Sequence, residues 1–450
     1  MEISRRNLLR SAGAGAVAIA GSGAGCVRPA LVDPQHPAAT TVIGPGGWCW
    51  FQSPRAVIDG RGELWIGSSQ GSGAPTPGSV DVTRVDLRTQ RVMVRHRLAV
   101  DRVDDHTSPS VLAVPGGVQV GWAPHRRVDW LEIGEAGGPL RRITRPGALT
   151  EPGRGTSYVS AHLVAGQRWV LYRGESFSWN LLTSVDGTSW TARGLVVAPG
   201  VSGHRPYVHA ASDGERLHLV VSDGNPSEFR GTGIWCGAIA PDLTIATASG
   251  RTIGRVGTAA VQPRALSALF TGRRGADEAT DTDGWTCDLQ VVHRRPTAIL
   301  SQRDPWPPEA TRISRWRHRY LWARQRGDGR WTVEHLAWAG GELYDRQPDY
   351  TGLAVVDPAD PTRVVASTNV HPATAIPLVS EVDGLVHHEL FEGRRQGEGQ
   401  WTWRAITEHS SVDNLRPVLV HGAGRSVTAW MRGTYRAWND FDTDIVARIA

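Results

Sequence analysis

The sequence predicts an all-β protein built as a seven-bladed β-propeller, and three observations carry this prediction. Seven segments share one pattern: a short apolar strand, a turn, and a return strand that ends in polar residues. These hairpins start about 50 to 80 residues apart, with further strand-like pieces between them, which is typical of blades of about four strands. Helical periodicity is weak throughout the chain. A solenoid and a pair of β-sandwiches are the alternatives that this pattern leaves open.

The seven hairpins follow one another along the chain, one for each expected blade. They are SPRAVIDGRGELWIGSSQ from Ser53, SPSVLAVPGGVQVGWAPH from Ser108, SYVSAHLVAGQRWVLYRG from Ser157, RPYVHAASDGERLHLVVSDG from Arg205, GWTCDLQVVHRRPTAILSQRD from Gly284, YTGLAVVDPADPTRVVASTNVHP from Tyr350 and RPVLVHGAGRSVTAWMRG from Arg416. The pieces RWTVEHLAW from Arg330 and WTWRAITEH from Trp401 are expected to be further strands. The segment SVDGTSW, residues 184–190, resembles a shortened Asp-box turn, which is a structural element rather than a catalytic one.

Residues 1–26 have the composition of an export signal. The pair Arg5-Arg6 precedes a mild Ala/Gly-rich stretch, as in twin-arginine signals, whose substrates are exported already folded. Cys26 is either a lipidation site or close to a simple cleavage site, because Gly23 stands where a bulky residue is usual. We expect residues 27–42 to be a linker and 43–450 to be the propeller. No later stretch is apolar enough to predict a transmembrane segment, so we expect an extracellular or envelope-bound protein.

Charge and cysteine content narrow the function further. All 49 basic residues are arginines, and they are scattered around a net charge of +5, which argues against nucleic-acid binding. Outside the signal, the cysteines are Cys49, Cys236 and Cys287. One disulfide between Cys236 and Cys287 is the most plausible pairing, although the sequence does not decide it. There is no CxxC pair, which argues against a zinc ribbon. We expect a monomer.

The ends of the hairpins are the expected place for a ligand site. The start of an outgoing strand and the end of its return strand lie at the same blade edge, so these ends form one face of the disc. Ligand sites on such scaffolds collect at loop-bearing ends. The residues there are Gln52 and Arg55; His106 and His125; Tyr158 and Arg173; Arg205, Tyr207 and Asp223; Arg303 and Asp304; Asn369 and His371; and Asn414, Arg416 and Arg432.

Two adjacent blades contribute a set of residues that suits β-elimination from a uronic acid. The set comprises His106, His125, Tyr158 and Arg173, and it lacks the paired carboxylates of ordinary glycoside hydrolysis. In β-elimination a cation must neutralise the uronate carboxylate, and the planar fork of Arg173 is suited to this. A base near neutral pKa removes the C5 proton, which histidine can do, and a tyrosine hydroxyl can protonate the leaving oxygen.

Several of these stretches resemble a known family. The segments GGWCWFQSPRAV, DDHTSPSVLAVPGG, SYVSAHLVAGQRWVLYRG, RPYVHAASDG and VDNLRP are similar, in order and spacing, to the BNR-repeat family that contains the ulvan lyases and related rhamnose–glucuronate lyases. The resemblance covers about residue 43 to the end. It implies a seven-bladed propeller and cleavage by β-elimination beside a uronate. It also implies that His106, His125, Tyr158 and Arg173 are the catalytic residues and that Tyr207 contacts substrate.

The sequence therefore predicts a secreted polysaccharide lyase. We expect it to cut a bond to glucuronate, most plausibly a rhamnose–glucuronate bond in an ulvan-like polymer or a plant gum side chain. His106 is assigned as the base, Tyr158 as the acid, Arg173 as the carboxylate neutraliser and His125 as a positioning partner. The roles of His106 and Tyr158 are interchangeable on the sequence alone.

The expected partner is an anionic, uronate-containing polysaccharide. The residues expected to bind it are Tyr207, Arg205, Arg55, Asn414 and Arg416. No cofactor is needed for the reaction, while a structural metal ion is left open, with no ligands assigned. The alternative functions are an α-L-rhamnosidase on the same propeller and a carbohydrate-binding propeller without turnover.

Overall fold

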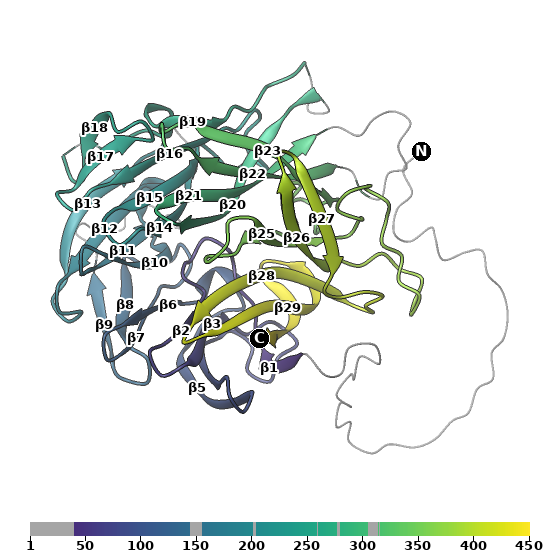
Figure 1. The fold of residues 1–450 in the computed structure, drawn as a ribbon. Helices are drawn as coiled ribbons and strands as arrows, with labels where there is room; N and C mark the ends of the chain where they lie inside the picture. The colour runs from purple at the N-terminus through teal and green to yellow at the C-terminus, as the bar shows by residue number, and fades with distance from the viewer. Residues whose placement is uncertain are drawn as a thin grey trace.

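The computed structural model describes residues 40–144, 155–200, 204–258, 260–276, 280–304, 314 and 316–450. Over these residues it is a seven-bladed β-propeller without α-helices, which confirms the predicted fold class (Figure 1). Each blade is one antiparallel sheet whose first strand lines the central channel. The inner strands of consecutive blades contact one another, and the last contacts the first, so the ring is closed.

The first four blades follow the chain in order. Their strands are β2 (Ala56–Ile58), β3 (Glu63–Ser69), β4 (Ser79–Asp86) and β5 (Arg91–Val100); β6 (Ser110–Val114), β7 (Gly117–Trp122), β8 (Trp130–Glu135) and β9 (Leu140–Thr144); β10 (Ser157–Val164), β11 (Gln167–Arg173), β12 (Trp179–Ser184) and β13 (Thr191–Val197); and β14 (Tyr207–Ser212), β15 (Leu217–Ser222), β16 (Ile234–Ile239), β17 (Thr244–Thr247), β18 (Thr252–Arg255) and β19 (Ser267–Phe270). Blade 4 is the enlarged one, because β19 pairs with β16 beside the main path.

The last three blades complete the disc. Their strands are β20 (Asp283–Val292), β21 (Arg295–Asp304), β22 (Arg317–Gln325) and β23 (Trp331–Gly340); β24 (Ala354–Val356), β25 (Arg363–Thr368), β26 (Glu389–Gly397) and β27 (Gln400–Ala405); and β28 (Asp413–Gly422), β29 (Arg425–Ala437), β30 (Asp440–Ile449) and β1 (Thr41–Pro45). The seven hairpins expected from the sequence are the seven inner strand pairs. The Asp-box-like segment is the turn between β12 and β13, where the Asp186 carboxylate accepts two backbone N–H groups.

The ring is closed by its own termini. Strand β1 is the outermost strand of blade 7, and it pairs antiparallel with β30, Thr41 opposite Ala447. In Figure 1 the purple start of β1 lies beside the yellow C-terminal strands. The strand begins two residues inside the predicted linker. The predicted export signal, with Cys26, lies outside the described residues.

A plug of aromatic residues fills the central channel beneath the site. It comes from residues 46–55, between β1 and β2. The ring centroid of Trp50 lies 5.3 Å from that of Trp285 and 4.9 Å from that of Tyr350, and Phe51 lies 4.6 Å from Tyr207. These partners come from the inner strands or inner edges of blades 4, 5 and 6, so the plug joins residues 46–55 to three consecutive blades that are distant from it in sequence. It provides a dry floor for the face above it.

The expected Cys236–Cys287 disulfide is absent, which corrects the sequence-based pairing. All three described cysteines are free and buried. Cys236 lies on β16 in the middle of blade 4, and Cys287 lies on the inner strand of blade 5. They pack in separate hydrophobic clusters, and the Cys236 thiol is directed to the carbonyl of Ser267. The number of residues between the two cysteines did not indicate that they would lie in different blades.

None of the helical segments in the described part of the chain is long and apolar enough to cross a membrane.

Candidate functional site

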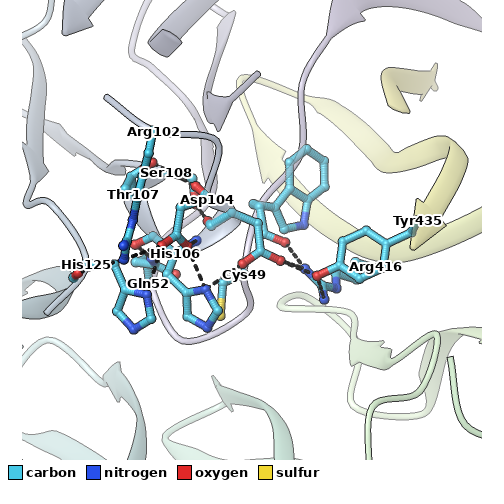
Figure 2. A network of polar contacts seen from close by, with 12 residues as sticks. Cys49, Gln52, Arg102, Asp104, His106, Thr107, Ser108, His125, Arg416 and Tyr435 are labelled. Atoms are coloured by element: carbon cyan, nitrogen blue, oxygen red, sulfur yellow. Dashed lines mark hydrogen bonds and ion pairs between the residues drawn. The ribbon is translucent and has the colours of Figure 1, made fainter. Parts of the chain in front are cut away.

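The site begins with a short 3-10 turn that precedes the inner strand of blade 2. This turn, η1 (Asp105–Thr107), is capped by Asp104, whose side chain accepts the backbone N–H of His106 at 3.0 Å. The same carboxylate contacts Nδ1 of His106 at 2.9 Å and Nδ1 of His125 at 3.0 Å. The two imidazole rings are stacked, with centroids 4.1 Å apart and an interplanar angle of 8° (Figure 2). One buried carboxylate therefore fixes both rings.

The hairpin of blade 2 brings these histidines together as its register requires. His106 precedes β6 and His125 follows β7, and these strands pair around the Pro115-Gly116 turn, with Val114 opposite Gly117. Gly116 takes a φ of +89°, a left-handed conformation that suits glycine. Trp438, in the turn between β29 and β30, stands edge-on to both rings, 5.4 Å from His106 and 5.8 Å from His125.

The stacked histidines hold one proton between them more readily than two. Burial and the charge of His106 lower the pKa of His125 to about 3. Burial also opposes a charge on His106, but neighbouring acidic groups outweigh it and raise the pKa of His106 well above its usual value. Those groups are Tyr158, Cys49, Asp105 and Asp104. His106 is therefore the charged ring and His125 the neutral one.

The two imidazole rings differ at Nε2. Nε2 of His125 is buried and has no hydrogen-bond partner among the described residues, whereas Nε2 of His106 is not enclosed in this way. The Nδ1 atoms of both rings contact the Asp104 carboxylate. His106 is therefore the better placed of the two rings to meet a ligand.

Tyr158 opens the inner strand of blade 3 beside these rings. Its ring centroid lies 5.5 Å from that of His106 and 5.8 Å from that of His125. The residue has a φ of +55°, a left-handed conformation that is costly for tyrosine and occurs mostly at functional positions. Its side chain is buried, and burial raises the pKa of its hydroxyl above the usual value. The phenol is therefore protonated at neutral pH.

Arg173 ends the return strand of blade 3, opposite Ser157 in the register. It is 1% exposed, and its Nη1 has no hydrogen-bond partner in the described part of the chain. Its guanidinium carbon lies 4.4 Å from the ring centroid of Tyr158 and 5.0 Å from that of Tyr207. Among the described residues no carboxylate forms an ion pair with it. A buried cation that has aromatic neighbours, a free Nη1 and no paired carboxylate among the described residues is suited to receive an anion from outside.

The structure places the other predicted binding residues in two groups. Tyr207 adjoins Arg173, and Arg205 lies at the edge, paired with Glu228 at 2.9 Å. Three more are buried and bonded within the protein: Arg55, Asn414 and Arg416. Arg55 donates to backbone carbonyls of Pro109 and Gln52, and Asn414 to His388 and Glu389. This placement favours a supporting role for these three over the expected contact with substrate.

The sequence-based analysis missed several residues that complete the site. Asp104 and Asp105 stand directly before His106, and a pair of acids next to a histidine was an available signal. Phe177 gathers three guanidinium groups around its ring, within 5.5 Å of its centroid; they belong to Arg126, Arg173 and Arg205. Phe177 follows a turn, and no sequence pattern indicated that it would face Arg173.

Two trios of side chains are close enough together to hold a metal ion. They are Asp104, His106 and His125, and Cys49, Asp105 and His106. In the first trio both imidazole Nδ1 atoms already contact the Asp104 carboxylate, so the donor atoms satisfy one another. In the second, Asp105 is already paired with Arg416. The contacts account for both trios without an ion, and we assign no metal ligand here.

The fold is shared with solved polysaccharide lyases. An ulvan lyase of polysaccharide lyase family PL25, bound to -[GlcA(1-4)Rha3S]-, matches with a TM-score of 0.58 at 10% identity, over 90% of this chain and 94% of that chain. Polysaccharide lyase Uly1 matches with a TM-score of 0.53 at 10% identity, over 96% and 93%. The sequence matches no protein-family model and no curated protein. At this identity the likeness shows the fold, and membership of the BNR-repeat family stays a prediction.

Proposed function

We propose that this protein is a polysaccharide lyase that cleaves a bond to a uronic acid by β-elimination. The observation that carries the proposal is Arg173, a buried guanidinium without a carboxylate partner among the described residues, beside a tyrosine and a stacked histidine pair. Binding of a uronate would supply the missing anion. Neutralising that carboxylate makes the C5 proton acidic enough to be removed.

In the proposed reaction, the neutral form of His106, reached once the ring has lost its own proton, takes the C5 proton at Nε2. The electron pair of the C5–H bond forms the C4=C5 double bond, and the C4–O4 bond breaks. Tyr158 protonates the departing O4, and the proton now held by His106 returns to the Tyr158 oxygen. Exchanging the roles of His106 and Tyr158 leaves the proton count unchanged. No water is consumed, so one product carries an unsaturated uronate.

The acids near the site are poorly suited to the alternative of hydrolysis. A glycosidase of the ordinary kind needs a protonated carboxyl group as its acid. Burial alone would raise the pKa of Asp104, but the charges of His125 and His106 hold it below its usual value. Burial opposes the charge of Asp105 too, and His106 and Arg416 likewise lower its pKa. Both carboxylates are thus ionised and engaged with neighbours.

The substrate we propose is a glucuronate-containing polymer, with a rhamnose–glucuronate bond as the bond that is cut. This is supported by the shared fold with the ulvan lyase, whose bound ligand contains GlcA and Rha3S, and by the arginines around Phe177. We also propose that the protein acts outside the cytoplasm, on the strength of the twin-arginine pattern at residues 1–26.

The test is a screen of uronate polysaccharides for products that absorb in the ultraviolet, followed by mass analysis. An unsaturated uronate end, with a product mass one water below the hydrolysed form, is the expected result. Saturated sugars from active protein would indicate a glycosidase such as a rhamnosidase. Sugar binding that gives no product with any uronate polymer would leave the binding propeller as the function.

A further inference from the structure

We propose that Arg416 and Tyr435, both from blade 7, are positioning residues that act on His106 through Asp105. This inference rests on the proposed lyase function, in which His106 meets the substrate. Both side chains are buried. In Figure 2, His106 lies between His125 on one side and the pair Arg416 and Tyr435 on the other.

The three side chains form one closed buried unit. The Tyr435 hydroxyl donates to Asp105 Oδ2 at 2.5 Å, and Arg416 Nη1 donates to the same oxygen. Arg416 Nη2 donates to the Tyr435 oxygen at 2.7 Å, and its Nη1 also reaches the carbonyl of Trp48. Arg416 is 1% exposed and Asp105 is fully buried.

A buried ion pair of this kind seldom stabilises a fold more than apolar residues would, because desolvation of both charges opposes their attraction. Arg416 also has a φ of +49°, at an irregularity in the pairing of β28 with β29. A strained backbone and a desolvated charge both cost stability. Both costs fall on the same residue, Arg416, whose guanidinium contacts the carboxylate beside His106, and this coincidence points to a task at the site.

Asp105 acts on His106 as a charge rather than as a hydrogen-bond acceptor. Its Oδ1 lies 2.7 Å from His106 Nδ1, yet that oxygen has no aligned hydrogen bond. The aligned contact of Nδ1 goes to Asp104 at 2.9 Å. Arg416 and Tyr435 therefore set how much of the Asp105 charge His106 senses.

His106 is surrounded by a small number of titratable and charged groups on every side. They are Asp104 and Asp105 at η1, His125 after β7, Tyr158 on β10, Cys49 in the plug, and Arg416 beyond Asp105. Blade 7 reaches the Asp105 side of this shell through Arg416 and Tyr435. Altering that side should change the protonation of His106 and leave the substrate contacts in place.

Two variants are expected to shift the pKa of the His106 ring in opposite directions. Tyr435→Phe removes a donor from Asp105, so His106 should hold its proton more firmly and the acid limb of kcat/KM should shift up by about one pH unit. The double variant Asp105→Asn/Arg416→Met removes both charges, so the limb should shift down by at least about one unit. KM should stay within about twofold in both.

The control is Tyr320→Phe, which deletes an equally buried hydroxyl in blade 5 that bonds to Thr351 and Ser367. It should leave the pH profile unchanged. The second readout is an NMR titration of the His106 ring, identified by its loss in His106→Gln. This titration needs no substrate, so it tests the inference even if no uronate polymer is cut.

Opposite shifts of the ring titration in the two variants would support the positioning role. Shifts in the same direction, or none beyond those of Tyr320→Phe, would overturn it. If the double variant does not fold, the Tyr435→Phe titration alone decides, and an unchanged His106 signal rejects the proposal.

Discussion

Replacing Arg173 by methionine is expected to separate activity from stability. The substitution keeps much of the side-chain volume and removes a charge that is 1% exposed and has no carboxylate partner in the described chain. Relief of the buried charge, worth several kcal/mol, opposes the loss of three cation–π contacts at 4.4, 5.0 and 5.4 Å, worth about 0.5–2 kcal/mol each. We expect the free energy of unfolding to change by no more than about 1 kcal/mol, or to rise.

The effect on catalysis should be large. Arg173 is the only residue assigned to neutralise the uronate carboxylate, and loss of one such electrostatic donor lowers kcat by about 10²–10³-fold. The assay is the growth of ultraviolet absorbance with a cleavable uronate polymer, alongside denaturant unfolding of the same preparation. Arg173→Lys keeps the charge without the planar fork, so its kcat should lie between those of the unaltered protein and of Arg173→Met.

Arg363→Met is the matched control, because it removes an arginine that is paired with carboxylates. Arg363 lies in blade 6 and pairs with Asp357 at 2.7 Å and Glu392 at 2.8 Å. Its removal takes from each carboxylate one charged hydrogen-bond partner, so stability should fall by about 1–3 kcal/mol while kcat is unchanged. Our reasoning is refuted if Arg173→Met keeps kcat within about threefold, or if it unfolds as readily as Arg363→Met.

Further outcomes follow from the same contacts. Tyr158→Phe should lower kcat by about 10²–10⁴-fold with little change in KM, since it removes the acid; a normal rate would exclude that role. The value of kcat/KM should rise with pH above neutrality, because His106 must lose its proton to act as base. Burial lowers the pKa of this ring, but the surrounding acidic groups outweigh burial and raise it. A falling kcat/KM over that range would contradict this. The pKa of Asp104 is lower in the folded state than the unfolded value near 3.8. The stability that Asp104 contributes should therefore be complete above that value and be lost as the pH falls below it. Asp104→Asn should abolish this part of the acid unfolding. Thiol titration in denaturant without reductant should find Cys236 and Cys287 free, and a disulfide-linked peptide in mass analysis would contradict the structure.

The sequence was informative wherever the signal was local. Each inner hairpin carries its own turn and its own alternation, so the seven blades could be recognised one at a time. The meeting of His106 with His125 followed from a single hairpin register. The position of Tyr158 and Arg173 on the next blade followed from the same rule.

Contacts between distant segments were beyond such reasoning. Arg55 and Arg416 lie near strand starts as expected, but Arg55 is bonded within the plug of residues 46–55 and Arg416 donates to the Trp48 carbonyl of that plug. The position of the plug depends on partners in three other blades. The pairing of Asp105 with Arg416 joins residues more than 300 positions apart. Only the assembled ring shows which polar residues at the blade ends remain open to a ligand.

The pairing of β1 with β30 also dictates an order of events during synthesis. Strand β1 leaves the ribosome before any blade, yet its partner, Asp440–Ile449, is made after the strands of the six other blades. Chains are built and fold from the N-terminus, so six blades can form while β1 still has no neighbour. The ring cannot close at β1 until β30 has been made. A chain that loses its final strand would expose unpaired edges in blade 7, which are prone to aggregation, even though every residue of the site had been made.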